Sequence, residues 1–186
     1  RRLRQLLVIA ARLNPFVRPP RHVCSEPRNG YVLQRWILYP EPRLEIPVLM
    51  LIPEGGIKRK PAPAILCLPG SDHPKELLCG EPSPYKTANP TNQREAMALA
   101  LVREGFVTVA ADNPATAEMF DRQCDDWRRH AGLLIWLGRN YEGVSTHQKL
   151  MILAWMRTLP WIDARRIGVC GHSLGAAGVQ EAIHCI

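Results

Sequence analysis

The sequence predicts an α/β fold, in which helices cover both faces of a mostly parallel sheet and an antiparallel hairpin forms the amino-terminal edge. The main observation is a set of three short, mostly apolar runs, at residues 64–68, 106–111 and 166–170. Runs that are apolar on both faces are typical of strands buried in a parallel sheet. Segments with helix-start and helix-stop signals separate them, and this alternation implies right-handed crossovers.

The composition suits one globular domain. Of the 186 residues, 46% are hydrophobic and 22% are charged, which excludes disordered and collagen-like chains. The net charge of +7 comes almost wholly from residues 1–22, which contain no acidic residue. Since the remainder is nearly neutral, we expect no nucleic-acid-binding surface.

We therefore divide the chain into a basic, Pro- and Arg-rich arm over residues 1–29 and a folded domain over residues 30–186. The arginines of the arm's first 22 residues are Arg1, Arg2, Arg4, Arg12, Arg18 and Arg21.

The folded domain begins with two strands. Residues 12–29 are rich in proline and arginine, and we expect them to be irregular. Residues 31–39 are rich in aromatic and aliphatic side chains, and the prolines that follow end this run. Residues 45–52 form a second run, which Pro53 and a pair of glycines stop. Two such runs joined by a proline-containing turn predict an antiparallel hairpin.

The first helix signal follows the buried strand at 64–68 and a long polar stretch at 69–90. Asn92, with Glu95 three residues on, caps a helix that runs to Arg103. A glycine at position 105 ends that helix, and the strand at 106–111 comes next.

Two more helices are predicted in the second half of the chain. Within residues 112–140, the apolar run 133–137 fits either a helix or a loop. Ser145 and Gln148 form a capping box for a helix that extends to about Leu159. The last strand, at 166–170, leads into a helix that begins after Ser173.

The motif that carries chemistry is Gly171-His172-Ser173-Leu174-Gly175, which has the form G-x-S-x-G. It lies between a predicted strand and a predicted helix, which is the context that a catalytic serine turn requires. A sharp turn there strains the backbone and lifts the Ser173 side chain clear of the sheet. Bulk at Gly171 or Gly175 is expected to clash with neighbouring backbone. Chance also produces this pattern in turns of small residues, but the flanking strand and helix favour the catalytic interpretation.

The motif also predicts an oxyanion hole, the pair of donors that stabilises negative charge on a substrate oxygen. The amide of Leu174 and the amino-terminal end of the last helix face the site where that charge develops. A second donor is expected from the loop after the strand 64–68, and Ser71 is our candidate. Pro69 lacks an N–H group and is excluded.

Three segments together resemble the α/β-hydrolase superfamily, in its dienelactone hydrolase and acetyl xylan esterase-like branch. Residues 161–176 (WIDARRIGVCGHSLGA) are similar to that branch's stretch through the serine turn. Residues 106–114 (FVTVAADNP) are similar to its fourth strand, and residues 137–140 with Gly143 to the loop before its next helix. The likeness spans roughly residues 31–186. It implies an amino-terminal portion of an α/β-hydrolase domain, a carboxylic ester or related acyl substrate, and no cofactor.

The chain departs from the family pattern in three places. Leu68-Pro69-Gly70 stands where the branch has His-Gly, and Gln148-Lys149 stands where it often has an acidic residue. The family order is Ser, then Asp, then His, so the resemblance puts both partners of Ser173 beyond Ile186. We therefore expect a fragment or truncated product, or a second chain that supplies the remaining strands. The strand 166–170 would then be an open edge that favours self-association.

Other candidate residues have less support. His172 is adjacent to Ser173, but neighbouring side chains diverge, so we expect it to line the substrate pocket rather than to act as the base. His73 lies in the loop of the second oxyanion donor and is either a further pocket residue or a plain surface histidine. His130 with the cysteine and aspartates at 124–126 lacks a recognised metal-ligand spacing, and we expect a solvated loop and no metal site.

The cysteines and the apolar runs bear on location. Six cysteines are present without a C-x-x-C pair, which gives no support to a zinc ribbon or a thioredoxin-like site. Free thiols favour a reducing compartment, so the expected location is cytoplasmic. No early apolar run approaches the roughly 20 residues of a membrane span. The chain begins with Arg rather than Met, which leaves the true amino terminus and any targeting signal open. The cysteines are Cys24, Cys67, Cys79, Cys124, Cys170 and Cys185.

The sequence thus predicts a serine hydrolase that acts on a small-molecule ester, with residues after 186 needed for full activity. The alternative is a non-catalytic domain that keeps the fold and binds a ligand or partner. A third hypothesis makes the basic arm a contact for an anionic membrane or a nucleic acid.

Overall fold

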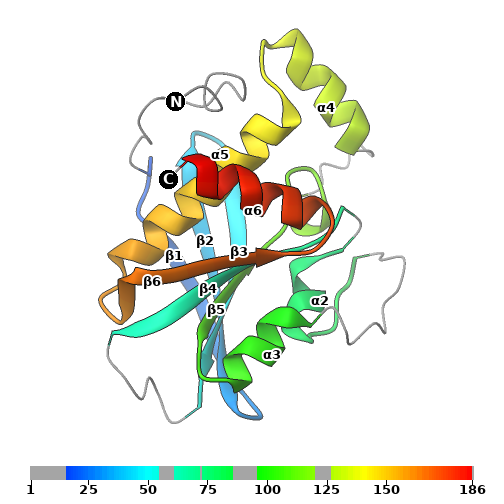
Figure 1. The fold of residues 1–186 in the computed structure, drawn as a ribbon. Coiled ribbons are helices and arrows are strands. Elements are labelled where there is room, and N and C mark those ends of the chain that lie inside the picture. Colours follow the sequence, from blue (N-terminus) through cyan, green and yellow to red (C-terminus); the bar gives the residue numbers. More distant parts are fainter. Residues whose placement is uncertain (1–15, 55–60, 72, 86–95, 120–126, 186) are drawn as a thin grey trace.

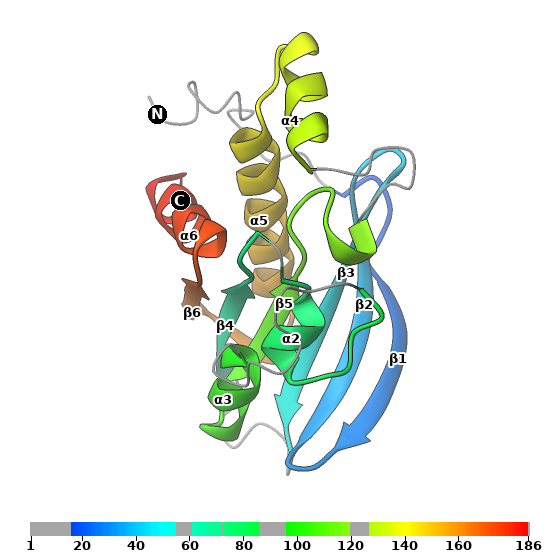
Figure 2. The same cartoon turned by 90° about the vertical axis from the view of Figure 1, so that its right-hand side faces the viewer.

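The computed structural model describes residues 16–54, 61–71, 73–85, 96–119 and 127–185, which form a twisted sheet between two layers of helices (Figure 1). Six strands are present in the described residues, in the order β1-β2-β3-β5-β4-β6. Helices α5 and α6 lie on one face of this sheet, and α2 and α3 lie on the other (Figure 2). The predicted α/β class, with a mixed sheet and helices on both faces, is confirmed. The helices are α2 (Lys75–Cys79), α3 (Met97–Arg103), α4 (Trp127–Trp136), α5 (Tyr141–Thr158) and α6 (Leu174–Cys185), with a short 3-10 helix, η2 (Ala117–Met119).

The amino-terminal part of the sheet is antiparallel. Strand β2 (Tyr31–Glu41) pairs with β3 (Leu44–Pro53), as the hairpin prediction required. Strand β1 (Arg21–Arg28) pairs antiparallel with the outer side of β2. The expectation that residues 12–29 are wholly irregular is therefore wrong for 21–28. Pro27 is tolerated there because β1 is an edge strand, where a missing N–H group costs no ladder hydrogen bond.

The carboxyl-terminal part of the sheet is parallel. Strand β4 (Ala62–Leu68) pairs in parallel with both β5 (Val107–Ala111) and β6 (Ile162–Gly171). Because these strands run the same way, their carboxyl ends meet at one edge, where ligands bind in open α/β sheets. Strand β3 pairs antiparallel with β5 and joins the two parts.

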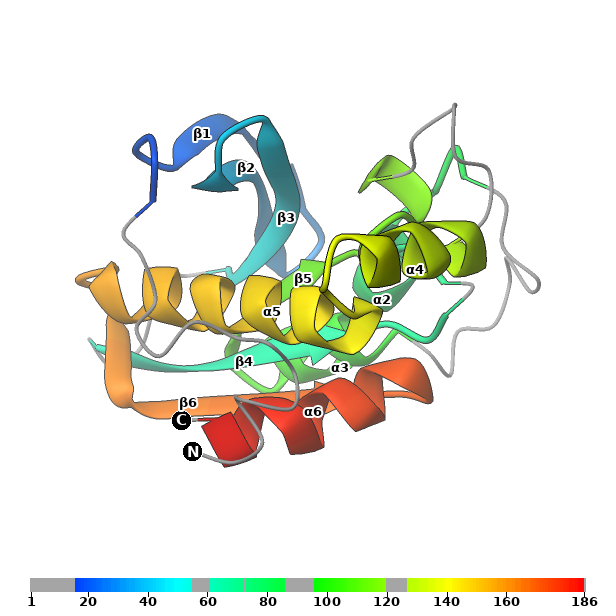
Figure 3. The same cartoon turned by 90° about the horizontal axis from the view of Figure 1, so that it is seen from above.

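Strand β6 is the last strand at its side of the sheet, with α6 beside it and β1 at the far side (Figure 3). Several of its side chains are half-buried or exposed. Self-association through this edge stays a prediction.

The helices differ from the predictions in two places, α2 and the start of α5, and α4 decides between the helix and the loop left open for the run 133–137. Helix α2 lies within the stretch read as polar, and its residues are buried. Residues 133–136 belong to helix α4. Helix α5 begins at Tyr141 rather than at the Ser145 capping box, because the Asn140 side chain accepts a hydrogen bond from Gly143 N at 2.6 Å. The predicted Asn92 cap lies outside the described residues, and α3 is described from Met97 on.

Two apolar clusters hold the layers together. One lies between the sheet and α5, where Ile152, Trp155 and Met156 pack against strand residues such as Leu66 and Val109. The other lies between the sheet and the α2–α3 layer. Every residue of β5 is buried, as expected for a central strand covered on both faces. The site described next sits at the carboxyl end of this buried framework.

Candidate active site

The turn between β6 and α6 presents Ser173 to solvent. The strand ends at Gly171, the helix begins at Leu174, and Ser173 between them is exposed. Its φ angle is +53°, in the left-handed region that residues with a side chain rarely adopt. The predicted sharp, strained turn is therefore present at this position.

Both glycines of the motif are required by close backbone contacts. A Cβ atom on Gly175 would lie 2.3 Å from the carbonyl oxygen of Leu68 in β4. A Cβ atom on Gly171 would lie 2.5 Å from the backbone of Gly175. Neither approach leaves room for a methyl group, so the expected clash at both positions is confirmed.

Backbone hydrogen bonds fix the turn against the neighbouring strand. The amide of His172 donates to Leu68 O at 3.2 Å, and the amide of Gly175 donates to His172 O at 2.8 Å. Leu174 is the first residue of α6, and helix geometry gives the amides of a first turn no acceptor within the helix. The positive end of the α6 dipole adds to the attraction for an anion at this place.

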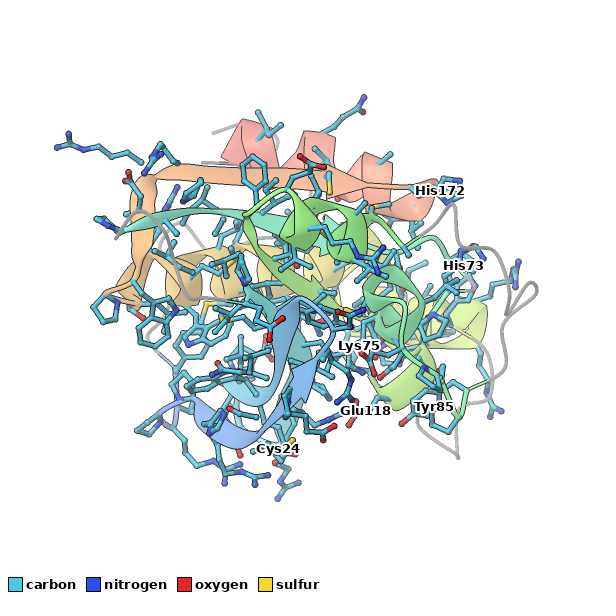
Figure 4. The ribbon with its side chains drawn as sticks, turned by 90° about the horizontal axis from the view of Figure 1, so that it is seen from below. Cys24, His73, Lys75, Tyr85, Glu118 and His172 are labelled. Atoms are coloured by element: carbon cyan, nitrogen blue, oxygen red, sulfur yellow. The ribbon has the colours of Figure 1, made fainter. Side chains whose placement is uncertain are left out.

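The loop after β4 approaches the same turn. A Cβ atom on Gly70 would lie 3.6 Å from Ser173 Cβ, 3.3 Å from His172 Nδ1 and 2.9 Å from His73 Nδ1. The rings of His73 and His172 have centroids 6.1 Å apart, and Figure 4 shows them at one side of the molecule. The structure thus brings together Ser173, His172 and His73 around Gly70. Ser71 follows Gly70 and is half-buried; its donor role stays a prediction.

Sequence reasoning did not single out Asn113, which lies beneath this loop. It follows β5, is buried, and its side-chain amide donates to the carbonyl oxygens of Pro69 at 3.1 Å and Gly70 at 3.2 Å. The one local signal is its position directly after the end of a buried strand. The two carbonyls that it binds lie more than 40 residues earlier in the chain.

A buried charge cluster lies next to Asn113. Lys75 is fully buried, and its Nζ lies 2.8 Å from Asp112 Oδ2, 3.0 Å from Glu76 Oε1 and 2.5 Å from Glu118 Oε2 (Figure 4 labels Lys75 and Glu118). Burial alone would lower the pKa of Lys75, but Asp112 and the two glutamates raise it above its usual value. Burial raises the pKa of Asp112 to about 6, although Lys75 opposes this shift.

Other sequence predictions have mixed outcomes. Asp163 orders the turn before the second half of β6: it accepts from Arg165 N at 3.0 Å and from Arg166 Nε at 2.6 Å. Residues 124–126, part of the rejected metal cluster with His130, lie outside the described residues. The described residues contain no group of three or more His, Cys, Asp or Glu that is placed to hold a metal ion. Among the helices that the structure describes, none has the length and apolar character needed to cross a membrane.

Comparisons with known proteins agree with this fold. The crystal structure of a putative acetyl xylan esterase from Bacteroides fragilis is 32% identical, with a TM-score of 0.86, and covers 100% of this chain. The chain spans only 49% of that protein's length. No curated protein matches the chain.

More distant structures share the fold. A methylesterase is 20% identical over 97% of this chain and 36% of its own, with a TM-score of 0.73. An acetyl xylan esterase from Paenibacillus sp. R4 is 15% identical over 93% of this chain and 51% of its own, with a TM-score of 0.64. A profile of the Abhydrolase family matches residues 10–181, which is most of the sequence. The chain therefore belongs to the abhydrolase family of α/β-hydrolases.

Proposed function

We propose that this chain carries the nucleophile and the oxyanion hole of a serine hydrolase that cleaves carboxylic esters. The observation that carries the proposal is Ser173, an exposed hydroxyl on a strained backbone between two glycines that admit no side chain. A residue held at positive φ costs the fold free energy, and such residues cluster at active sites.

In the proposed reaction, Ser173 Oγ attacks the carbonyl carbon of the ester and gives up its proton to a base. The carbonyl oxygen gains negative charge, which the amides of Leu174 and Ser71 stabilise with the α6 dipole. The tetrahedral intermediate then releases the alcohol, which takes the proton back from the base. Water then gives a proton to the same base and attacks the acyl carbon. The bond to Ser173 Oγ breaks, the carboxylic acid leaves, and the base returns the proton to Oγ.

We propose that the base is a histidine held by an aspartate, and that both are supplied by residues outside these 186. The family order places them after Ser173, and the Bacteroides relative is about twice as long as this chain. We assign His73 and His172 to the substrate pocket, since both rings flank Gly70 next to Ser173. Carbohydrate esters, and acetyl esters first, are the substrates to test, because a relative 32% identical is described as an acetyl xylan esterase.

A fluorophosphonate probe tests the proposal, because it phosphonylates only an activated serine. The protein is expressed with any residues that its gene encodes after Ile186, and the modified residue is located by peptide mass spectrometry. We expect labelling at Ser173, loss of labelling and of acetyl-ester hydrolysis in Ser173→Ala, and no loss in Ser25→Ala. Ser25 is a matched control because it lies on β1, at the opposite side of the sheet from β6.

A well-folded protein that neither labels nor hydrolyses esters would instead support the non-catalytic binding domain. Comparison with residues 1–186 alone tests whether the base lies outside them: we expect labelling of this shorter chain to be at least about tenfold slower, because a serine needs an adjacent base.

A further inference from the structure

We infer that Asn113, together with Asp112, is a positioning residue that fixes the loop carrying the second oxyanion donor. The inference rests on the proposed function. Asn113 and Asp112 follow β5 directly. Asn113 binds Pro69 and Gly70 after β4, and Asp112 binds Lys75 at the start of α2. We do not propose that either residue contacts the substrate. Both act by positioning the loop between β4 and α2.

Asn113 holds the start of the loop. Its Nδ2 donates to Pro69 O at 3.1 Å and to Gly70 O at 3.2 Å, and its exposed fraction is 1%. Both partners are carbonyl oxygens, which only accept, so the amide must turn its NH₂ group towards them. Oδ1 is then left buried with no hydrogen-bond partner among the described residues. An aspartate or an aliphatic side chain at this position could not bind both carbonyls.

Asp112 holds the end of the loop. Its Oδ1 accepts from the amide of Lys75 at 2.7 Å, and its Oδ2 accepts from Lys75 Nζ at 2.8 Å. Lys75 is the first residue of α2, so the carboxylate contacts the amino-terminal end of that helix, where an acidic group stabilises free helix amides. Two consecutive side chains directly after the central strand β5 therefore anchor both ends of one short loop.

Asn113 is itself held in place. Its backbone carbonyl oxygen accepts hydrogen bonds from Thr116 N at 3.2 Å and from Thr116 Oγ1 at 2.8 Å. The next carbonyl, of Pro114, accepts from the hydroxyl of Tyr141 at 2.9 Å, which ties this turn to α5. The sheet and α5 thus fix the position of the Asn113 side-chain amide. This amide in turn holds the loop in place through its two hydrogen bonds.

The place where Asn113 binds is the place where the loop meets Ser173. Gly70 accepts one of the two hydrogen bonds, and a Cβ atom there would lie 3.6 Å from Ser173 Cβ. Oxyanion stabilisation depends on donors that are already placed before charge develops, and a misplacement of about 1 Å costs up to about 100-fold in rate. Loss of the Asn113 amide should therefore act on the transition state more than on substrate binding.

The test uses p-nitrophenyl acetate and the protein expressed with any residues that follow Ile186. Asn113→Ala removes both donated hydrogen bonds, and Asn113→Asp keeps the shape but loses the donors when ionised. Thr108→Val is the matched control: it removes a buried side-chain hydrogen bond of β5, the strand that Asn113 follows, from Thr108 Oγ1 to Ala98 O, away from the loop. All variants are assayed well below their thermal midpoints, and amide hydrogen exchange is followed in peptides that cover residues 66–78.

We expect Asn113→Ala to lower kcat by about 10- to 100-fold with KM changed less than about threefold. Asn113→Asp should recover relative to wild type as the pH falls, because the protonated acid regains one donor, whereas Asn113→Ala should not. Exchange in the loop should rise in Asn113→Ala and stay unchanged in Thr108→Val.

The positioning role is overturned if the wild type is active but Asn113→Ala changes kcat and loop exchange no more than Thr108→Val does. That result leaves the proposed chemistry at Ser173 intact. A wild type without ester hydrolysis or fluorophosphonate labelling overturns the proposed function and this inference with it.

Discussion

The sulfur atoms of Cys67 and Cys170 lie 3.5 Å apart on directly paired residues of the parallel strands β4 and β6. Cys67 is buried and Cys170 is half-buried. The hydrogen bond between the thiols, together with burial, raises the pKa of Cys67. The same contact lowers the pKa of Cys170, because a thiolate there accepts a hydrogen bond from Cys67. Two chemically identical groups in contact thus have opposite tendencies to ionise.

This asymmetry predicts the order of thiol modification. We expect iodoacetamide at pH 8 to alkylate Cys170 at least about tenfold faster than Cys67, because the thiolate is the reactive species. Peptide mass spectrometry over a time course gives both rates. Cys79, which is fully buried and has a raised pKa, serves as the unreactive control. Equal rates at Cys67 and Cys170 would contradict the prediction.

The second prediction concerns the close contact between the serine turn and β4. Gly175→Ala should destabilise the protein by about 3 kcal/mol or more, since the added Cβ meets the carbonyls of Leu68 and Pro69, which are backbone and cannot rotate away. Gly132→Ala in α4 is the control, because nothing lies within 4 Å of its Cβ, and it should stabilise by up to about 1 kcal/mol. Urea denaturation measures both; a Gly175→Ala variant as stable as wild type would refute the contact.

Lys149 gives a prediction for stability at alkaline pH. Its amine is buried between α5 and α6, 2.7 Å from Ser145 Oγ, and burial lowers its pKa to about 8 although Glu181 and Glu142 oppose this. The folded state therefore binds the proton less tightly than the unfolded state, so stability should rise between about pH 8 and pH 10.5. The rise should be on the order of 3 kcal/mol from this group, at about 1.4 kcal/mol per pKa unit.

Lys149→Met should remove this dependence and stabilise the protein at pH 7 by roughly 1 kcal/mol or more, because a neutral side chain avoids the cost of a buried charge. Denaturant unfolding of wild type and variant at several pH values checks both statements. Parallel stability curves between pH 8 and pH 10 would show that this amine does not titrate in the folded state as stated.

Asp112 gives a prediction of the opposite slope at acid pH. Burial raises its pKa from 3.8 to about 6, so the folded state holds the proton more tightly than the unfolded state. Stability should therefore fall, by about 2 kcal/mol from this group, as the pH rises from about 4 to 6. Asp112→Asn keeps an acceptor for the Lys75 amide and should abolish this fall. The thermal midpoint of the wild type should therefore fall relative to that of the variant over this range. A constant difference between the two midpoints would contradict the assignment.

The sequence predicted those elements whose signals are local. Strands β4 and β5 are covered on both faces, so their sequences are nearly continuous apolar runs. Strand β6 was located by a similar run, but residues 166–170 are half-buried or exposed at the edge of the sheet, so the expectation that they are buried is wrong. The turn at Ser173 was predicted for a similar reason, since a tight turn, two close backbone approaches and a helix start all fall within five residues. The family resemblance also rested on this segment.

Other elements depend on partners far along the chain and were missed. Strand β1 contains charges and Pro27, which an edge strand accepts and which a search for apolar alternation rejects. Helix α2 begins at a lysine that is buried because Asp112 binds it from 37 residues away. Ser145 resembled a helix cap, yet it lies inside α5 as a partner of Lys149. Asn113 was missed as well, because nothing near it in the sequence identifies the carbonyls that it binds.

The left-handed backbone at Ser173 has a consequence for engineering this protein towards higher stability. Glycine adopts that conformation freely, and exchanging serine for it would relieve roughly 1 kcal/mol of local strain. A directed-evolution campaign scored on heat resistance or expression yield alone would therefore drift towards glycine at codon 173 and discard the hydroxyl. Libraries built on this scaffold should hold that codon fixed.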